Sequence, residues 1–130
     1  MGIHIEWDNQ THSTIRQIFD QHWTWDDFYG AKRRVDAMID MVHQPVGLIL
    51  DMPANVVMPP NALSHGKQYI DTEHPNLCLI VIVSTNQVLQ TLYNLFGKVY
   101  PIATHRVRMV ANMEAAREIL AHTRHSLTML

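Results

Sequence analysis

The chain has 130 residues, enough for one domain with one hydrophobic core, and this length excludes a two-domain enzyme with a cleft between its halves. Hydrophobic residues make up 47% of the chain and charged residues 17%, which excludes a disordered or fibrous protein. Ten basic and twelve acidic side chains give a formal net charge of -2, so no nucleic-acid partner is expected, because binding to phosphate backbones needs an excess of Lys and Arg.

The beginning of the chain predicts a β-hairpin. In residues 3–7 apolar and polar side chains alternate, which is typical of a half-buried strand. Asp8, Asn9 and Gln10 supply turn residues, and a second strand is expected within residues 12–19.

A helix is predicted to begin after Thr24. The Thr24 hydroxyl can cap the helix, Asp27 is placed to complete a capping box, and Trp23 and Phe28 occupy the two positions of a hydrophobic staple. The apolar stripe expected to face the core consists of Ala31, Val35, Met38, Ile39 and Val42.

Two continuous apolar runs, residues 46–51 and 77–83, predict parallel strands that are covered on both faces. The second run contains Cys78, the single cysteine, which therefore has no intramolecular disulfide partner. Between the runs, Asn61 is expected to cap a helix that ends near His74.

The last third of the chain predicts two more helices and a strand. Ser84 with Gln87 offers a capping box for a helix that Pro101 stops. Residues 106–110 alternate as an edge strand, and Asn112 is expected to cap the final helix.

The predicted order is therefore β-β-α-β-α-β-α-β-α, which favours an α/β fold with a mainly parallel sheet and helices packed against it. Residues 1–130 form one predicted domain, and the sequence leaves open whether residues 126–130 are a disordered tail. The N-terminal residues lack the features of a signal peptide, and no apolar run approaches the ~20 residues of a membrane span, so a cytoplasmic location is expected.

Three motifs carry a family resemblance: WTWDDF at residues 23–28, LILD at residues 48–51 and NMEAARE at residues 112–118. With these motifs the chain resembles the SpoIIAA-like family, small stand-alone relatives of the STAS domain. The resemblance implies a STAS-like fold. Pro60 stands where antagonists of this type carry the phospho-acceptor serine, so that phosphorylation switch is expected to be absent.

The same resemblance extends to CRAL-TRIO lipid-transfer domains, and it implies a function. A non-enzymatic domain is expected that binds a small apolar or amphipathic ligand or associates peripherally with a membrane. The alternative is a protein-interaction or regulatory module of the anti-sigma-factor antagonist type.

Polar candidates for a ligand site follow from the predicted topology, because ligands of open α/β sheets bind beyond the carboxyl ends of the strands. Two such ends precede helix N-termini, which favour an anion or a polar head group. The residues at these ends are Asp51, Asn61, Ser84, Thr85 and Asn86. The alternative is that Asn61 and Ser84 only cap their helices, and that Asp51 fixes the loop that follows it.

Apolar candidates lie on the helix after Ser84, which has two neighbouring apolar stripes. The stripe expected to pack in the core consists of Val88, Leu92, Leu95 and Val99, and the second consists of Leu89, Tyr93, Phe96 and Tyr100. An apolar surface beyond the needs of the core indicates a pocket lined by Leu89, Tyr93 and Phe96 or a homodimer contact, and the alternative is broad burial of the helix.

No catalytic residue, metal site or cofactor is predicted. The sequence lacks a G-x-S-x-G elbow, a phosphate-binding G-x-x-x-x-G-K loop and an H-E-x-x-H motif. Only His122 and His125 among the nine histidines have helical ligand spacing, and no third ligand is near them in sequence.

Overall fold

The computed structural model describes the backbone of residues 2–128 and the side chains of residues 2–123. The chain forms an α/β fold whose strands and helices follow the predicted order, with one added 3-10 helix. The elements are β1 (Ile3–Trp7), β2 (Thr14–Phe19), α1 (Trp25–Asp40), β3 (Val46–Asp51), α2 (Ala62–Asp71), β4 (Leu77–Val83), α3 (Gln87–Val99), η1 (Ala103–Arg106), β5 (Val107–Val110) and α4 (Met113–Thr128).

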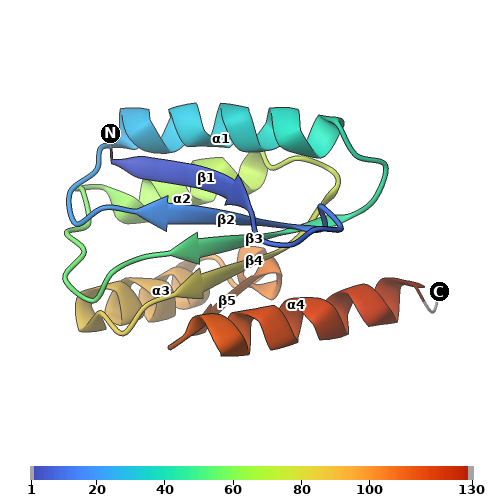
Figure 1. Cartoon of the computed structure of the whole chain (residues 1–130). Helices are drawn as coiled ribbons and strands as arrows, with labels where there is room; N and C mark the ends of the chain where they lie inside the picture. Colours follow the sequence, from blue (N-terminus) through green and yellow to red (C-terminus); the bar gives the residue numbers. More distant parts are fainter. Residues whose placement is uncertain (1, 129–130) are drawn as a thin grey trace.

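The five strands form one mixed sheet whose spatial order equals their order in the chain (Figure 1). β1 and β2 are antiparallel, with Ile3 opposite Phe19 and Trp7 opposite Ile15, which confirms the predicted hairpin. β2, β3, β4 and β5 pair in parallel. β5 lies at one edge of the sheet, as expected, and β1 forms the other edge.

The two faces of the sheet are covered unequally. We call the face that packs against α1, α2 and α3 the three-helix face, and the face that packs against α4 the one-helix face (Figure 1). On the three-helix face, Leu48 and Ile80 pack with Val35 of α1 in the main hydrophobic core. The smaller core on the one-helix face holds Ile49, Leu79, Val81, Val83, Ala116 and Leu120. Alternate residues of β3 and β4 are thus buried on both faces, as the continuous apolar runs predict.

The start of α1 forms by short-range interactions, and each predicted one is present. The Thr24 hydroxyl accepts a hydrogen bond from the Asp27 N–H at 3.1 Å, and the Asp27 carboxylate accepts one from the Thr24 N–H at 3.0 Å. The rings of Trp23 and Phe28 pack with their centroids 5.7 Å apart. The capping box and the hydrophobic staple are both confirmed.

The predicted ends of α2 need correction. Asn61 occupies the N-cap position, but its backbone is left-handed, with φ 68°, and its side chain makes no capping hydrogen bond. The Ser64 hydroxyl instead donates to the Asn61 carbonyl oxygen at 3.0 Å. The helix ends at Asp71 and not near His74, because the Thr72 hydroxyl donates to the Gln68 carbonyl oxygen at 2.8 Å and closes the last turn.

The predicted cap of α3 is wrong by two residues. Asn86 is the N-cap, and its side-chain oxygen accepts from the Leu89 N–H at 2.9 Å. Ser84 still follows the path of β4, because its N–H donates to the carbonyl oxygen of Val110 in β5, and its hydroxyl accepts from the Asn86 N–H at 3.1 Å. The helix ends at Val99, just before Pro101, as expected.

The cap of α4 is confirmed, since the Asn112 side-chain oxygen accepts from the Ala115 N–H at 2.8 Å. The helix extends to Thr128. Residues 126–128, for which the sequence left a disordered tail open, are therefore helical. Residues 129–130 lie outside the described part of the chain.

Gln17 is a polar residue that is buried among the apolar side chains of the main core. It is fully buried on the three-helix face, opposite Ile5 and Leu50, and its amide finds no hydrogen-bond partner among the described residues. We expect Gln17→Met to raise the free energy of unfolding by about 1–3 kcal/mol, because it removes an unpaired polar group at nearly constant volume. Urea unfolding measures the change, and the exposed Gln87→Met is the control. A loss of stability in Gln17→Met would contradict the prediction.

Candidate functional site

The main candidate site is a cavity of about 130 Å³ on the three-helix face of the sheet. Its floor is formed by strands β3, β4 and β5, two of its walls by α2 and α3, and its end by the start of α1 with the segment that leads into α2. The lining residues are Trp23, Trp25, Phe28, Leu50, Met52, Met58, Ala62, Leu63, Gly66, Tyr69, Ile70, Ile80, Ile82, Leu89, Leu92, Tyr93, Phe96 and Val107. None of them carries a formal charge at neutral pH.

The cavity opens to solvent where its lining residues are only half-buried. Trp23, Phe28 and Leu89 are among its buried lining residues. Met58 and Leu63 are only half-buried. The half-buried part of the lining therefore places the mouth between the first turns of α2, the facing side of α3 and the segment before α2.

Two polar atoms of the lining are engaged within the protein, whereas the buried Trp23 Nε1 has no hydrogen-bond partner among the described residues. Trp25 Nε1 donates to the Pro60 carbonyl oxygen at 2.7 Å, and the Tyr93 hydroxyl donates to the Val107 carbonyl oxygen at 3.1 Å. Burial raises the pKa of Tyr69, and the nearby carboxylates of Asp36 and Glu73 raise it further, so this phenol stays neutral. The lining thus presents an apolar surface to a ligand.

Packed aromatic rings form the part of the lining at the start of α1. Trp25 meets Trp23 edge-to-face with ring centroids 5.0 Å apart and Phe28 edge-to-face at 5.4 Å, and Phe28 lies 5.0 Å from Tyr69. Edge-to-face contacts are favoured geometries for aromatic pairs. Because these rings belong to α1, α2 and the residues just before α1, they fix the two helices relative to each other.

His65 of α2 completes this connection on the side of the mouth. Its ring stacks on Trp25 with centroids 4.2 Å apart and an interplanar angle of 18°. The Tyr29 hydroxyl lies 2.6 Å from His65 Nδ1 and donates to Gln68 Oε1 at 3.2 Å. The first turns of α1 and α2 are thereby linked by both stacking and hydrogen bonds.

The structure divides the predicted site residues into two groups. Leu89, Tyr93 and Phe96 line the cavity, as the second stripe of α3 predicts, whereas the five polar candidates are not part of the lining. Asp51 receives hydrogen bonds from Arg16 Nε at 3.0 Å and Nη2 at 2.5 Å, so it pairs with a side chain and not with the loop that follows it. Its side chain belongs to the one-helix face, since Leu50 beside it faces the cavity.

The remaining polar candidates have structural roles or are exposed. Asn86 caps α3, and its side-chain N–H donates to the Ala54 carbonyl oxygen at 2.8 Å, which holds the segment before α2. Ser84 supports Asn86 through its hydroxyl. Asn61 and Thr85 are exposed to solvent.

The prediction that Val88, Leu92, Leu95 and Val99 form the core stripe of α3 is wrong. Leu89, expected on the pocket stripe, is the buried residue of the helix, while three members of the expected core stripe face solvent. The exposed fractions are 64% for Val88, 42% for Leu95 and 50% for Val99, and Ile102 after the helix is 84% exposed. Only Leu92 of that stripe reaches the cavity.

Sequence reasoning missed most of the lining. Met52 and Met58 belong to the irregular segment after β3, where no periodic pattern marks a buried side. Leu63 and Gly66 lie on α2, and a Cβ added at Gly66 would come within 3.2 Å of Phe96 Cε2. The sequence signal that could have indicated this close approach of α2 to α3 is a glycine inside a predicted helix.

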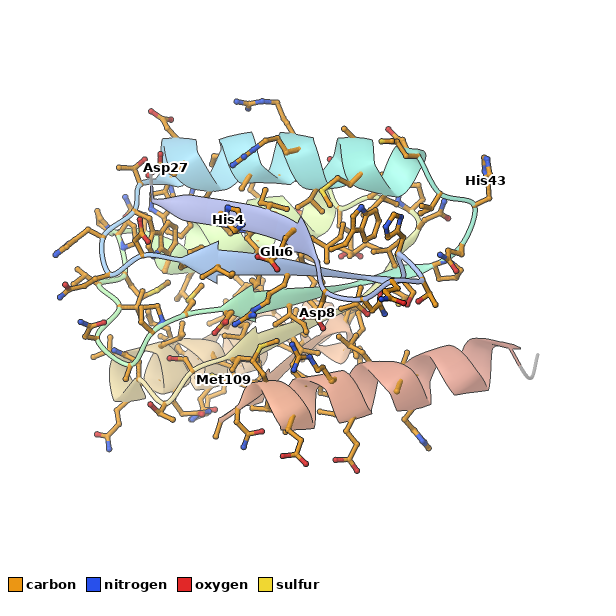
Figure 2. The ribbon with its side chains drawn as sticks, viewed as in Figure 1. His4, Glu6, Asp8, Asp27, His43 and Met109 are labelled. Atoms are coloured by element: carbon orange, nitrogen blue, oxygen red, sulfur yellow. The ribbon has the colours of Figure 1, made fainter. Side chains whose placement is uncertain are left out.

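A second, polar groove of about 410 Å³ runs between the β1–β2 turn and α4. Arg117 of α4 donates to both carboxylate oxygens of Asp8, at 3.0 and 2.9 Å, and the Asn9 side chain bonds the N–H groups of Ser13 and Thr14. Figure 2 shows Asp8 at the end of β1, beyond His4 and Glu6 on the same strand. Because these polar groups pair with one another, we assign the groove a structural role.

The described residues provide neither a metal site nor a membrane-spanning helix. Among the side chains of residues 2–123, no group of three His, Cys, Asp or Glu could hold a metal ion. The side chain of His125, one of the two histidines with ligand spacing, lies outside that range. None of the described helices has the length and apolar composition needed to cross a bilayer.

A scan against models of known protein families finds no match, and neither a search of curated proteins nor a search of solved structures finds a significant one.

Proposed function

We propose that this chain is a non-enzymatic binding domain that holds a small apolar ligand in the cavity between α2, α3 and the sheet. The observation that carries the proposal is the lining, in which every side chain is apolar or aromatic or a neutral phenol. Protein interiors are packed to crystal density, so an open apolar space of this size is uncommon unless something occupies it. A ligand that removes such surface from water gains about 25 cal/mol per Å² of apolar area.

We further propose that the fold is of the STAS-like, SpoIIAA-like type. Support comes from the three motifs and from the run of β-α units in which each strand lies beside the one before it. The three connecting helices pack on one face, so successive crossovers have the same hand. In such a fold the space between α2 and α3 lies above β3, β4 and β5, where the cavity is found.

The test uses methionine methyl groups as reporters, because Met52 and Met58 line the cavity and Met41 is exposed to solvent far from the core. In protein labelled with 13C at the methionine methyls, small apolar compounds should shift the signals of Met52 and Met58 and leave Met41 unchanged. Native mass spectrometry of gently purified protein would detect a ligand that is carried along.

A cavity-filling substitution supplies the matched variant for this test. Ala62→Phe should weaken binding at least about tenfold, since the added ring occupies part of the apolar volume on which affinity depends. Ala121→Phe on the exposed side of α4 is the control and should bind as the unchanged protein does. Gly66→Ala is a milder variant that narrows the mouth against Phe96. The proposal fails if no compound shifts Met52 or Met58, or if Ala62→Phe binds equally well in its folded state.

Self-association through the outer side of α3 is a second candidate function. On α3 the apolar residues Val88, Leu92, Leu95 and Val99 recur at intervals of four, three and four, the spacing with which helices pair in coiled coils. Ile102, beyond the end of the helix, adds exposed apolar surface. The helix contains one charged residue, Lys98, so two antiparallel copies would meet with little like-charge repulsion.

Sedimentation measurements check this candidate directly. We expect a concentration-dependent dimer, and we expect Leu95→Lys to shift it to monomer by placing a charge in the centre of the apolar row. Leu92 is left unchanged because it also lines the cavity. A monomer at all concentrations up to about 1 mM, near the weak end of specific association, would rule the dimer out.

A further inference from the structure

The cavity also selects which apolar ligands can enter, and two features of it bear on ligand class: its volume and the chemistry of its lining. We infer that the ligand is a compact, uncharged molecule of about the size of one six-membered ring, and not a long-chain amphiphile. This inference rests on the proposed function and makes it more specific.

The volume limits the ligand to a single ring. The cavity holds about 130 Å³, and an engineered apolar cavity of about 150 Å³ in another protein stays dry and takes up benzene. Six of the lining side chains are aromatic: Trp23, Trp25, Phe28, Tyr69, Tyr93 and Phe96. Aromatic rings pack best on other rings in offset or edge-to-face geometry, so this lining favours a flat guest over a flexible chain.

The lining also discriminates against charge. The polar atoms of Trp25 and Tyr93 bond carbonyl oxygens of the protein, and the Tyr69 phenol is neutral. The Trp23 indole N–H has no partner among the described residues, but it is uncharged and buried. A carboxylate inside the cavity would lose its hydration and gain no ion-pair partner, which is costly.

Three of the polar residues predicted to hold a head group are already engaged. Asp51 pairs with Arg16, Ser84 accepts from Asn86, and Asn86 caps α3. None of these three residues is part of the cavity lining. They therefore offer no free polar group to the head of an amphipathic ligand in the cavity.

The cavity volume also sets a length limit, because about 130 Å³ is filled by little more than one ring. A long chain that enters would have to leave most of its methylenes in water. Each methylene that enters the cavity should gain about 0.8 kcal/mol of binding free energy, which raises the affinity about fourfold. Affinity should therefore stop rising with chain length once the cavity is filled.

Two ligand series on the unchanged protein test the inference, with the methyl shifts of Met52 and Met58 as the readout. Toluene and benzoate have similar shapes and differ in charge, and we expect benzoate at pH 7 to bind at least about thirtyfold more weakly. Toluene, ethylbenzene, butylbenzene and hexylbenzene differ in length, and we expect an initial rise in affinity followed by a plateau.

The possible outcomes separate this inference from the proposed function. If dodecanoate shifts Met52 and Met58 and binds more tightly than toluene, or if benzoate binds as well as toluene, the inference is wrong while the binding function stands. If affinity rises fourfold with every methylene through hexylbenzene, the size limit is wrong. If no compound of any series shifts these two signals, the proposed function itself fails.

Discussion

Replacing Gly47 with valine should lower the free energy of unfolding by about 3 kcal/mol, because β3 and α4 leave no room for a side chain there. A Cβ added at Gly47 would lie 2.5 Å from Leu120 Cδ2, well inside van der Waals contact. Leu120 is itself buried in the core of the one-helix face and cannot swing into solvent without losing that burial. Urea unfolding followed by circular dichroism measures the change.

A double-mutant cycle distinguishes this clash from a general sensitivity of the strand. Leu120→Ala alone should cost about 2–5 kcal/mol as a large-to-small core substitution. Together with Gly47→Val it should cost clearly less than the sum of the two changes, because the valine occupies the space that the leucine vacates. Gly97→Val, where an added Cβ meets Thr104 at an ordinary 3.6 Å, should change stability by less than about 1 kcal/mol. Additive costs in the cycle would show that the two residues do not compete for space.

The second large effect is expected at the ion pair between Glu73 and Arg106. Arg106 Nη1 lies 2.8 Å from Glu73 Oε1, and the Glu73 side chain is only 10% exposed. Its other carboxylate oxygen is buried without a hydrogen-bond partner among the described residues. Arg106→Ala should therefore cost about 2 kcal/mol at pH 7, less than a fully buried pair, because Arg106 is 44% exposed. Adding Glu73→Gln to Arg106→Ala should recover part of this loss, and no recovery would contradict the explanation.

Glu73 should also make stability depend on pH. Burial raises the pKa of Glu73 above its usual 4.5, and the attraction of Arg106 and Lys32 opposes this only in part. The folded protein thus favours the protonated carboxyl more than the unfolded chain does, and this stabilisation is present below pH 4.5 and lost as the pH rises through the raised pKa.

A comparison with Glu73→Gln isolates this contribution, because glutamine stays uncharged at every pH. Between pH 4 and pH 7, the stability of the unchanged protein should fall relative to that of Glu73→Gln. Urea unfolding at several pH values in this range gives the difference. Parallel pH curves for the two proteins would show that Glu73 has no raised pKa.

Elements defined by neighbouring residues were predictable from the sequence. The start of α1 is an example, since Thr24 and Asp27 bond each other across one turn and Trp23 packs on Phe28 without help from the rest of the chain. The cap of α4 at Asn112 is another. Caps that depend on how a strand ends were not predictable, because Ser84 is held by a hydrogen bond to β5 and so leaves the capping of α3 to Asn86.

The orientation of α3 could not be predicted for a similar reason. Both of its stripes consist of apolar or aromatic residues, and the position of α2 and the sheet decides which one turns inward. Leu89, Tyr93 and Phe96 were correctly expected at a pocket because an excess of apolar surface is visible in sequence. The opposite wall, with Met58 and Leu63, comes from a different part of the chain and depends on tertiary packing.

The aromatic cluster at the start of α1 has a practical consequence for spectroscopy. Trp23 and Trp25 both line the cavity and face each other edge-on at 5.0 Å, so their coupled electronic transitions respond to any guest that displaces either ring. The third tryptophan, Trp7, stacks on His12 at the far end of β1 and contributes a constant background that Trp7→Phe removes. We therefore expect a guest in the cavity to change the near-ultraviolet circular dichroism of the unlabelled protein.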